Sequence, residues 1–222
     1  GDFVATGQDL LCDASGQLGA GALDAQLAVN FSATGTRLQL DLNAQDVAMD
    51  DDIRHAVQEV EELRLLWEDL GNPQGGDLDL ELTLRGDDFA NENQIQIRGL
   101  VKGAKTTPTF LPIAVEAQEV GFRWRPGMVA FEGLVHAAQS PWLLKGGWNQ
   151  GLWVKAQTTQ FKPQEKERHI LEKLLNFPVG LAQFPIGNVG DAEVNLNLRK
   201  GTQSSLTLLG KIFLHDTRLE TP

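Results

Sequence analysis

The sequence has little of several things that particular classes of protein require. Its one cysteine, Cys12, allows neither an internal disulfide nor a thiolate metal site. It has 19 basic and 30 acidic residues, a formal net charge of −11, and no cluster of Lys or Arg interrupts the acidic excess. A chain of this charge repels a nucleic-acid backbone and is disfavoured at an anionic membrane surface. We therefore expect neither as a direct partner of this sequence.

Long apolar runs are absent as well. No stretch approaches the roughly 18 apolar residues that a membrane span requires. The first residues, GDFVATGQDLL, have neither the basic nor the apolar region of a signal peptide. The sequence starts at Gly1 and stops at Pro222, directly after a strand-like run. We therefore expect an excised piece of a longer protein, attached to a membrane through segments outside this sequence.

No constellation of residues indicates catalysis or metal binding. The four histidines lack the spacing of a zinc site: His55, His136, His169 and His215. Cys12 has no histidine nearby in the sequence to activate it as a nucleophile. Asp77, Asp79 and Glu81 alternate along a strand, which is typical of a solvated face rather than of a calcium loop. We expect no enzymatic activity, no cofactor and no metal.

Apolar and polar residues alternate through much of the chain, and this period of two predicts β-strands. Residues 23–31 and 38–42 alternate on either side of a glycine-bearing turn and predict a hairpin. A second hairpin is expected over residues 120–131, around an Arg-Pro-Gly sequence suited to a tight turn. Residues 1–21, which are rich in glycine, predict short and weak strands.

Two helices are expected between the strands. The first spans about residues 51–70, with Asp50 or Asp51 as its N-cap and a stop at Gly71. Its apolar residues advance by three and four positions and form one stripe: Ile53, Val57, Val60, Leu63 and Trp67. The second helix, over about residues 164–176, is shorter. Each stripe must pack on an apolar surface, and the strands that follow provide one.

Parts of the chain recur at one fixed offset. Arg54-His55 recurs as Arg168-His169, and the strand over residues 77–85 recurs over 191–199. The alternating runs before and after these segments recur with them. The sequence therefore predicts one elongated β-rich domain over residues 1–222, made of a first copy at about 36–103, a β-hairpin section at 104–149 and a second copy at about 150–214.

The expected fold is mainly β with short α-helices: a twisted antiparallel sheet that forms a half-open groove or a β-sandwich, built from a duplicated strand-helix-strand unit. Its strands carry more one-sided apolar surface than two short helices can cover. Uncovered apolar surface of this kind indicates a partner or an apolar ligand. The expected lining of such a groove is Leu38, Leu40, Leu42, Leu78, Leu80, Leu82, Leu84, Val154, Val194, Leu196 and Leu198.

Several segments together resemble a known family. These are the strand pattern G-D-x-x-x-x-L-x-L-[RK] at residues 76–85 and 190–199, and the run GFRWRPGMVAFEGLVH at residues 121–136, followed by Gly-Gly-Trp. They resemble AsmA-like proteins of bacterial envelopes, within the repeating-β-groove class of bridge-like lipid-transfer proteins. The resemblance implies a half-open sheet with an apolar concave face and flanking helices. It also implies a periplasmic domain of a membrane-anchored protein.

The sequence is compatible with three functions. The first is a non-catalytic envelope module that binds or conducts lipid acyl chains, in lipid transport or outer-membrane homeostasis. The second is a β-sandwich scaffold or protein-interaction domain with a filled core. The third is a carbohydrate-binding module, suggested by tryptophans in the middle of the chain, Trp124, Trp148 and Trp153, although core or edge packing is the commoner use of such residues.

Overall fold

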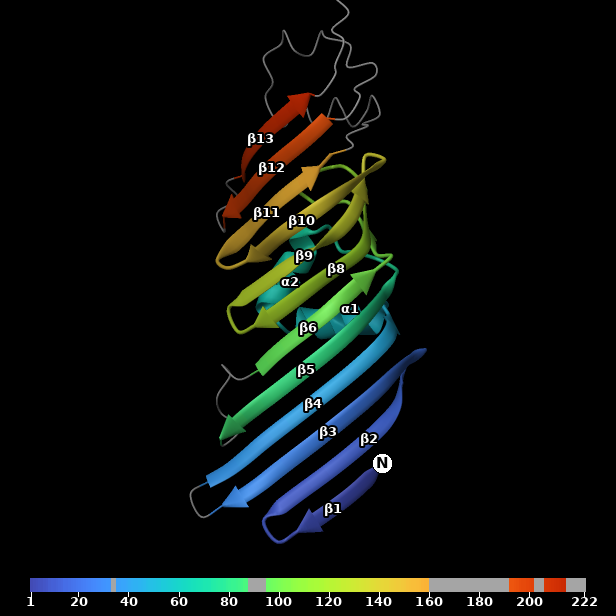
Figure 1. The fold of residues 1–222 in the computed structure, drawn as a ribbon, viewed down its shortest axis with the longest axis vertical. Coiled ribbons are helices and arrows are strands. Elements are labelled where there is room, and N and C mark those ends of the chain that lie inside the picture. Colours follow the sequence, from blue (N-terminus) through green and yellow to red (C-terminus); the bar gives the residue numbers. More distant parts are fainter. Residues whose placement is uncertain (33–34, 88–94, 160–191, 202–205, 215–222) are drawn as a thin grey trace, which may run out of the picture.

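The computed structural model describes residues 1–32, 35–87, 95–159, 192–201 and 206–214. In the last two of these ranges it describes the backbone and few of the side chains. Most of the described chain belongs to one sheet of thirteen strands (Figure 1). The strands are β1 (Asp2–Thr6), β2 (Asp9–Leu18), β3 (Gly21–Ser32), β4 (Gly35–Ala48), β5 (Asp77–Asp87), β6 (Ile95–Lys102), β7 (Lys105–Thr106), β8 (Val115–Arg125), β9 (Met128–Ala137), β10 (Ser140–Trp148), β11 (Gly151–Thr158), β12 (Ala192–Gly201) and β13 (Leu206–Leu214).

The strands follow one another across the sheet in chain order, and neighbours are antiparallel. Only β7 leaves this order, because it pairs with β8 beside the main path. Strands β1 and β13 lie at opposite ends and do not pair with each other. The protein is therefore mainly β, as predicted, and its described strands form a single open sheet. The described ranges contain no second sheet of the kind that a β-sandwich requires.

The helix expected over residues 51–70 is instead two helices, α1 (Asp51–Gln58) and α2 (Glu61–Asp69). The predicted cap is confirmed, because the Asp50 carboxylate accepts hydrogen bonds from the backbone N–H groups of Asp52 and Ile53. The prediction of one continuous helix is wrong at Val60, whose backbone is extended, with φ −112° and ψ 111°. A straight helix presents one stripe to one patch of a sheet. The break at Val60 lets Leu66 of α2 pack on β8, β9 and β11, while Trp67 of α2 still contacts the cluster that contains Ile53 of α1.

The predicted hairpins are confirmed as β3 with β4 and as β8 with β9. In the second, Gly127 supplies the left-handed backbone of the turn, with φ 79°. The expectation of short strands near the N-terminus is wrong for β2, which has 10 residues and is paired along its length with β3.

The second copy of the predicted repeat is described only in part. Its predicted strands are confirmed as β11, β12 and β13, whereas its helix, over about residues 164–176, lies outside the described residues. Any three successive strands of this sheet share the same order and directions. The strand order therefore does not distinguish a duplicated unit from the rest, and the duplication remains a prediction.

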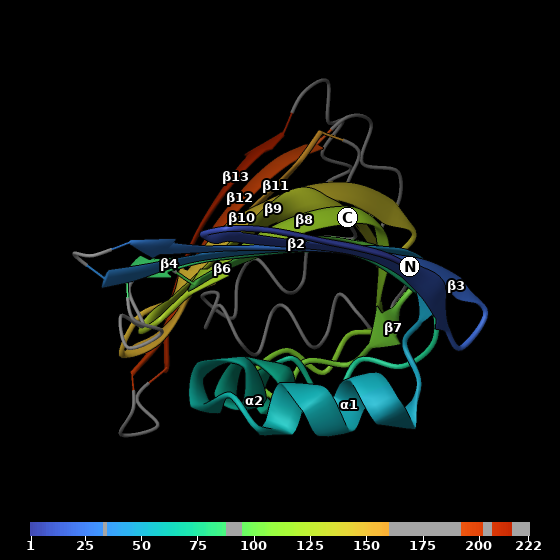
Figure 2. The ribbon, with the colours of Figure 1, turned by 90° about the horizontal axis from the view of Figure 1, so that it is seen from below.

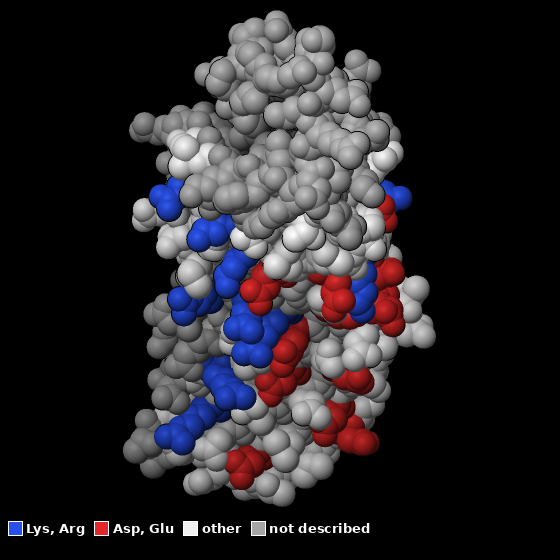
Figure 3. All heavy atoms as spheres, turned by 45° about the horizontal axis from the view of Figure 1, so that its top comes forward, with Lys and Arg blue, Asp and Glu red and all other residues white. Residues whose placement is uncertain are grey.

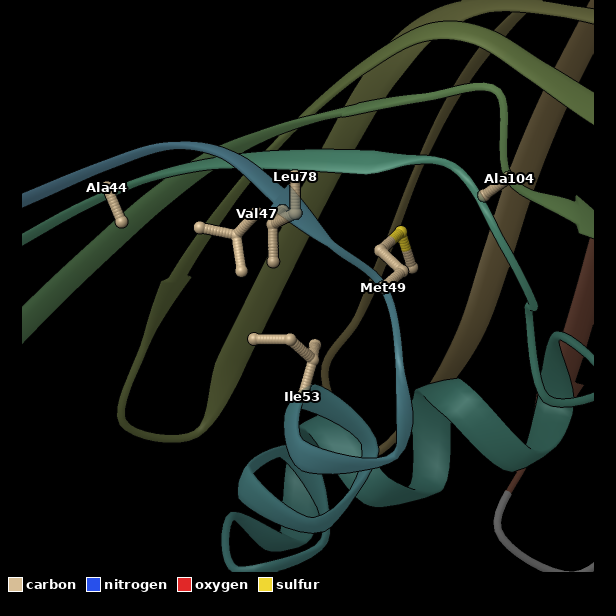
Figure 4. Close-up of a cluster of buried hydrophobic side chains, with 6 residues drawn as sticks. All are labelled: Ala44, Val47, Met49, Ile53, Leu78 and Ala104. Carbon is tan, nitrogen blue, oxygen red and sulfur yellow. The ribbon is translucent and has the colours of Figure 1, made fainter. Parts of the chain in front are cut away.

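Both helices lie on the same side of the sheet (Figure 2). We call the sheet face toward the helices the inner face and the opposite one the outer face. Three buried clusters lie on the inner side, and one of them joins α1 to β4 and β5 (Figure 4). Its buried members are Ala44, Val47, Met49, Ile53, Leu78 and Ala104.

A second cluster joins α2 to the strands farther along the sheet. Leu66 of α2 packs with Trp124, Val129 and Leu152, which come from β8, β9 and β11. The third cluster has Ile113, from the loop before β8, against Val135 and other residues of β9 and β10. The inner face is thus covered by α1, α2 and this loop near the middle of the sheet.

Candidate functional site

The inner face is apolar across the width of the sheet. Leu40 of β4 is opposite Leu27 of β3 on one side and Leu84 of β5 on the other. The same pairing of apolar residues continues through later strands, for example between Ile97 of β6 and Trp124 of β8. Because residues directly opposite each other share a face, these pairs form continuous apolar rows. The rows make this face the candidate functional surface.

The structure places the predicted lining residues on the inner face, but at different depths. Leu38 and Leu78 are buried, each 5% exposed. Six are half-buried: Leu40, Leu42, Leu80, Leu82, Leu84 and Val154. Leu42, Leu78 and Leu80 belong to the cluster under α1, and Val154 belongs to the cluster under α2. The remaining three, Val194, Leu196 and Leu198, lie on β12 at positions opposite Thr158, Ala156 and Val154, and their side chains are outside the described part.

Three of the predicted residues are half-buried without belonging to any of the three clusters. They are Leu40, Leu82 and Leu84, which sit together where β4 pairs with β5. Leu40 is opposite Leu84, and Leu82 is opposite Leu42. The centre of the inner face is therefore packed against helices, whereas this neighbouring patch keeps part of its apolar surface accessible.

One charged residue occupies an inner-face position in the described strands. This is Lys200 of β12, opposite Leu152 of β11. Its ammonium group forms an ion pair and hydrogen bond with the carboxylate of Asp69 at the end of α2. The two side chains are 27% and 19% exposed. The pairing offsets the cost of partly burying these two charges, and the contact ties α2 to β12.

Two phenylalanines, flanked on each side by a glycine, form a row across the middle of the inner face. Phe122 of β8 is opposite Gly99 of β6 and Phe131 of β9, and Phe131 is opposite Gly146 of β10. Each ring lies over the neighbouring glycine, since a Cβ added at Gly99 would be 2.3 Å from the ring of Phe122. At Gly146 a Cβ would be 2.4 Å from the ring of Phe131. These glycines leave room for aromatic rings that fill the centre of the sheet.

This row was not predicted from the sequence. The available signal is a glycine at an inward position of an otherwise alternating strand, which often marks a close approach by another group. The partner of each glycine follows only from the strand register.

Asp79, one of the alternating carboxylates of β5, has a structural role. It accepts a hydrogen bond from the backbone N–H of Asp46 at 2.9 Å and forms an ion pair with Lys102, also at 2.9 Å. Asp46 has a left-handed backbone, φ 53°, at the bulge where the pairing of β4 with β5 shifts register. The backbone hydrogen bond and then Lys102 hold the pKa of the Asp79 carboxyl below its ordinary value. Hydrogen bonding to Asp79 likewise raises the pKa of Lys102.

Two hollows stand out on the surface, and neither contains a predicted lining residue. One, of about 430 Å³, lies on the outer face and is lined by Glu81, Thr83, Arg85, Gln96 and Arg98. The other, of about 590 Å³, lies where α2 ends and β7, β8 and β9 meet, and most of its lining side chains are polar.

The remaining sequence candidates do not gather into a site. Trp124 and Trp148 pack in the cluster under α2, whereas Trp153 lies on the outer face over Gly147. The three tryptophans therefore do not form one exposed platform for sugars. The described part of the chain contains no group of three or more His, Cys, Asp or Glu residues placed to hold a metal ion. In the same part, no helix combines the length and apolar character that crossing a membrane requires.

Comparison with protein families, with curated proteins and with solved structures finds no match for this chain.

Proposed function

We propose that this chain is a non-catalytic module of a bacterial cell envelope that binds or conducts lipid acyl chains along the inner face of its sheet. In this proposal it is a periplasmic domain of a membrane-anchored, AsmA-like protein of the repeating-β-groove class, acting in lipid transport or outer-membrane homeostasis. The observation that supports it is the apolar inner face, which carries a single charged residue in the described strands and keeps a leucine patch partly accessible.

The chemistry of that face suits a hydrocarbon chain. An acyl chain gains roughly 0.8 kcal/mol for each CH₂ group that it removes from water. The patch of Leu40, Leu82 and Leu84 offers apolar contacts and no charge. A rigid sheet presents these side chains in a fixed arrangement, so little ordering is needed on binding.

The same proposal includes the shape of the sheet and its internal duplication. The sheet, with α1 and α2 along its inner side, acts as a half-open groove, and the duplicated strand-helix-strand unit repeats the apolar strand face along its length. Val194, Leu196 and Leu198 of β12 extend the lining beyond β11 through their register with Val154 and its neighbours.

The proposal is tested by purifying the protein from a bacterial host and identifying bound lipid by native mass spectrometry and by solvent extraction. Co-purified phospholipid or fatty acid, at a defined stoichiometry, is the expected result. A protein that is folded, binds no added fluorescent fatty acid and carries no extracted lipid contradicts the proposal.

A matched pair of variants locates the binding surface. Leu82→Glu puts a charge on the inner face, and Thr83→Glu puts the same charge on the outer face one residue later. The first is expected to weaken fatty-acid binding at least tenfold, because an acyl chain cannot pair with a carboxylate, and the second is expected to leave it unchanged. Equal losses in both variants contradict an inner-face site. Circular dichroism of both variants establishes that each one is folded.

A second candidate is a scaffold or protein-interaction domain. The observation that favours it is the cover provided by α1, α2 and the loop containing Ile113, which bury three clusters at the centre of the inner face. Under this alternative the leucine patch contacts another protein, and lipid is absent from the purified chain.

A further inference from the structure

The outer face carries arginines that are distant in the sequence and adjacent in the sheet. Arg98 of β6 is directly opposite Arg123 of β8. Arg85 of β5 lines the same hollow as Arg98. All three side chains are exposed, and Figure 3 shows Lys and Arg side chains gathered in a band along this side of the molecule. The chain has a negative net charge, yet this part of its outer face is locally basic.

The pairing of Arg98 with Arg123 opposes folding, whereas Glu81 of β5, opposite Arg98 on its other side, offsets part of that repulsion. Side chains directly opposite each other on antiparallel strands have Cβ atoms about 4.5–5.5 Å apart, and like charges at such positions are destabilising. Among the described residues, no carboxylate forms an ion pair with Arg85, Arg98 or Arg123. Other cations of the chain do have such partners, for example Lys102 with Asp79 and Lys145 with Glu132.

The hollow beside these arginines has the size and polarity for a small anion. Its volume is about 430 Å³, and it is open on the outer face. The guanidinium groups of Arg85 and Arg98 border it together with the hydroxyl of Thr83 and the amide of Gln96, which supply further hydrogen-bond donors. Glu81 contributes one negative charge to the rim, so the arginines of the hollow and the adjoining Arg123 leave a net positive site.

We propose that this hollow binds a phosphate group, with Arg98 as its central ligand and Arg85 and Arg123 on either side. The planar guanidinium group matches phosphate oxygens in a bidentate fashion, which distinguishes this site from a general attraction of cations for anions. A bound phosphate also removes the repulsion between Arg98 and Arg123. The site lies on the face opposite the leucine patch, so its failure leaves the proposed lipid function untouched, and the reverse also holds.

The test measures the thermal unfolding midpoint and isothermal binding of inorganic phosphate, with chloride at equal ionic strength as the reference. Phosphate is expected to raise the midpoint of the wild-type protein. Arg98→Gln is expected to weaken phosphate binding about tenfold or more. Arg98→Gln without phosphate is expected to be about as stable as the wild type, since the substitution removes both the repulsion from Arg123 and the attraction to Glu81. The control is Arg54→Gln on α1, which makes the same change in net charge on the opposite side of the sheet.

Two further measurements complete the experiment: one uses a variant that removes a negative charge, and the other tests binding to lipid vesicles. Glu81→Gln removes the rim carboxylate and is expected to tighten phosphate binding several-fold. Vesicles of phosphatidylglycerol and of phosphatidylcholine, tested by flotation, distinguish a lipid headgroup from free phosphate. Binding of vesicles alone, lost in Arg98→Gln, supports the same site with a lipid phosphate as its ligand. The proposal is overturned if neither ligand binds, or if Arg98→Gln and Arg54→Gln have equal effects.

Discussion

The close approach of Phe122 to Gly99 makes a quantitative prediction for the substitution Gly99→Ala. A Cβ at this position would lie 2.3 Å from the ring of Phe122 and 3.0 Å from the carbonyl oxygen of Asp79. The backbone oxygen belongs to a paired strand, so the ring has to move. That ring is partly buried in the cluster under α1, so moving it disturbs the packing there. Overpacking of this kind costs about 1–3 kcal/mol of folding free energy.

Gly16→Ala is a matched control for this change. Gly16 lies on β2 at an inner-face position, opposite Leu23, and a Cβ there meets nothing within 4 Å. Both variants lose the same flexible residue from the unfolded chain, which by itself stabilises by about 0.4–1 kcal/mol. The difference between the two variants therefore isolates the crowding at Phe122. For a chain of this size, about 1–3 kcal/mol corresponds to roughly 2–12 °C in the unfolding midpoint.

Urea titration followed by circular dichroism measures both stabilities, and the double variant Gly99→Ala/Phe122→Leu tests the cause. A smaller side chain at Phe122 leaves room for the new methyl group, so the double variant is expected to lose less than the sum of the single losses, by more than about 0.5 kcal/mol. If Gly99→Ala is as stable as Gly16→Ala, the ring does not occupy the space above Gly99 and the reasoning is refuted.

Three further predictions concern the helices and the bulge. Leu66→Ala removes the buried contact of α2 with Trp124 and Val129 and is expected to cost about 2–5 kcal/mol in urea unfolding, while a loss below about 1 kcal/mol would mean that α2 does not dock there. Asp50→Ala removes the cap of α1 and is expected to cost about 1 kcal/mol, with Asp50→Asn nearly neutral. The lowered pKa of Asp79 means that its charge stabilises the fold above the unfolded-state value near 3.8, and that this contribution is lost as pH falls through the lower folded-state pKa. Between about pH 5 and pH 2, Asp79→Asn is therefore expected to show a weaker pH dependence of stability than the wild type, and identical pH profiles would count against the hydrogen bond to Asp46.

Strand positions were predictable because period-two alternation is a local property of the sequence. Leu38, Leu40 and Leu42 indicated both the strand and the face that its side chains share, and the structure places them on the inner face. The break between α1 and α2 was not predictable in the same way. The apolar spacing of three and four continues through Val60, and no glycine or proline marks the interruption. The break follows from where two separate clusters lie on the sheet, which is a tertiary property.

The grouping of arginines on the outer face could not be predicted from local sequence patterns either. Arg98 and Arg123 are separated in the chain by β7 and a loop, and no window of the sequence contains a basic cluster. Their proximity depends on the register of β6 with β8. The row of Phe122 and Gly99 depends on that same register. Alternation defined the faces of individual strands, and only the alignment between strands revealed which side chains meet.

The chain-order arrangement of the sheet has a consequence for how the molecule comes apart. Apart from β8, which also pairs with β7, each strand on the main path is hydrogen-bonded only to its neighbours along that path, so the array behaves as a stack of coupled layers along one axis. The first layer, β1, has five residues, all exposed, and a partner on one side only. Amide protons of β1 should exchange with solvent faster than those of β4 to β9, where the helices hold the layers together. Opening can thus begin at the end of the array while its centre stays intact.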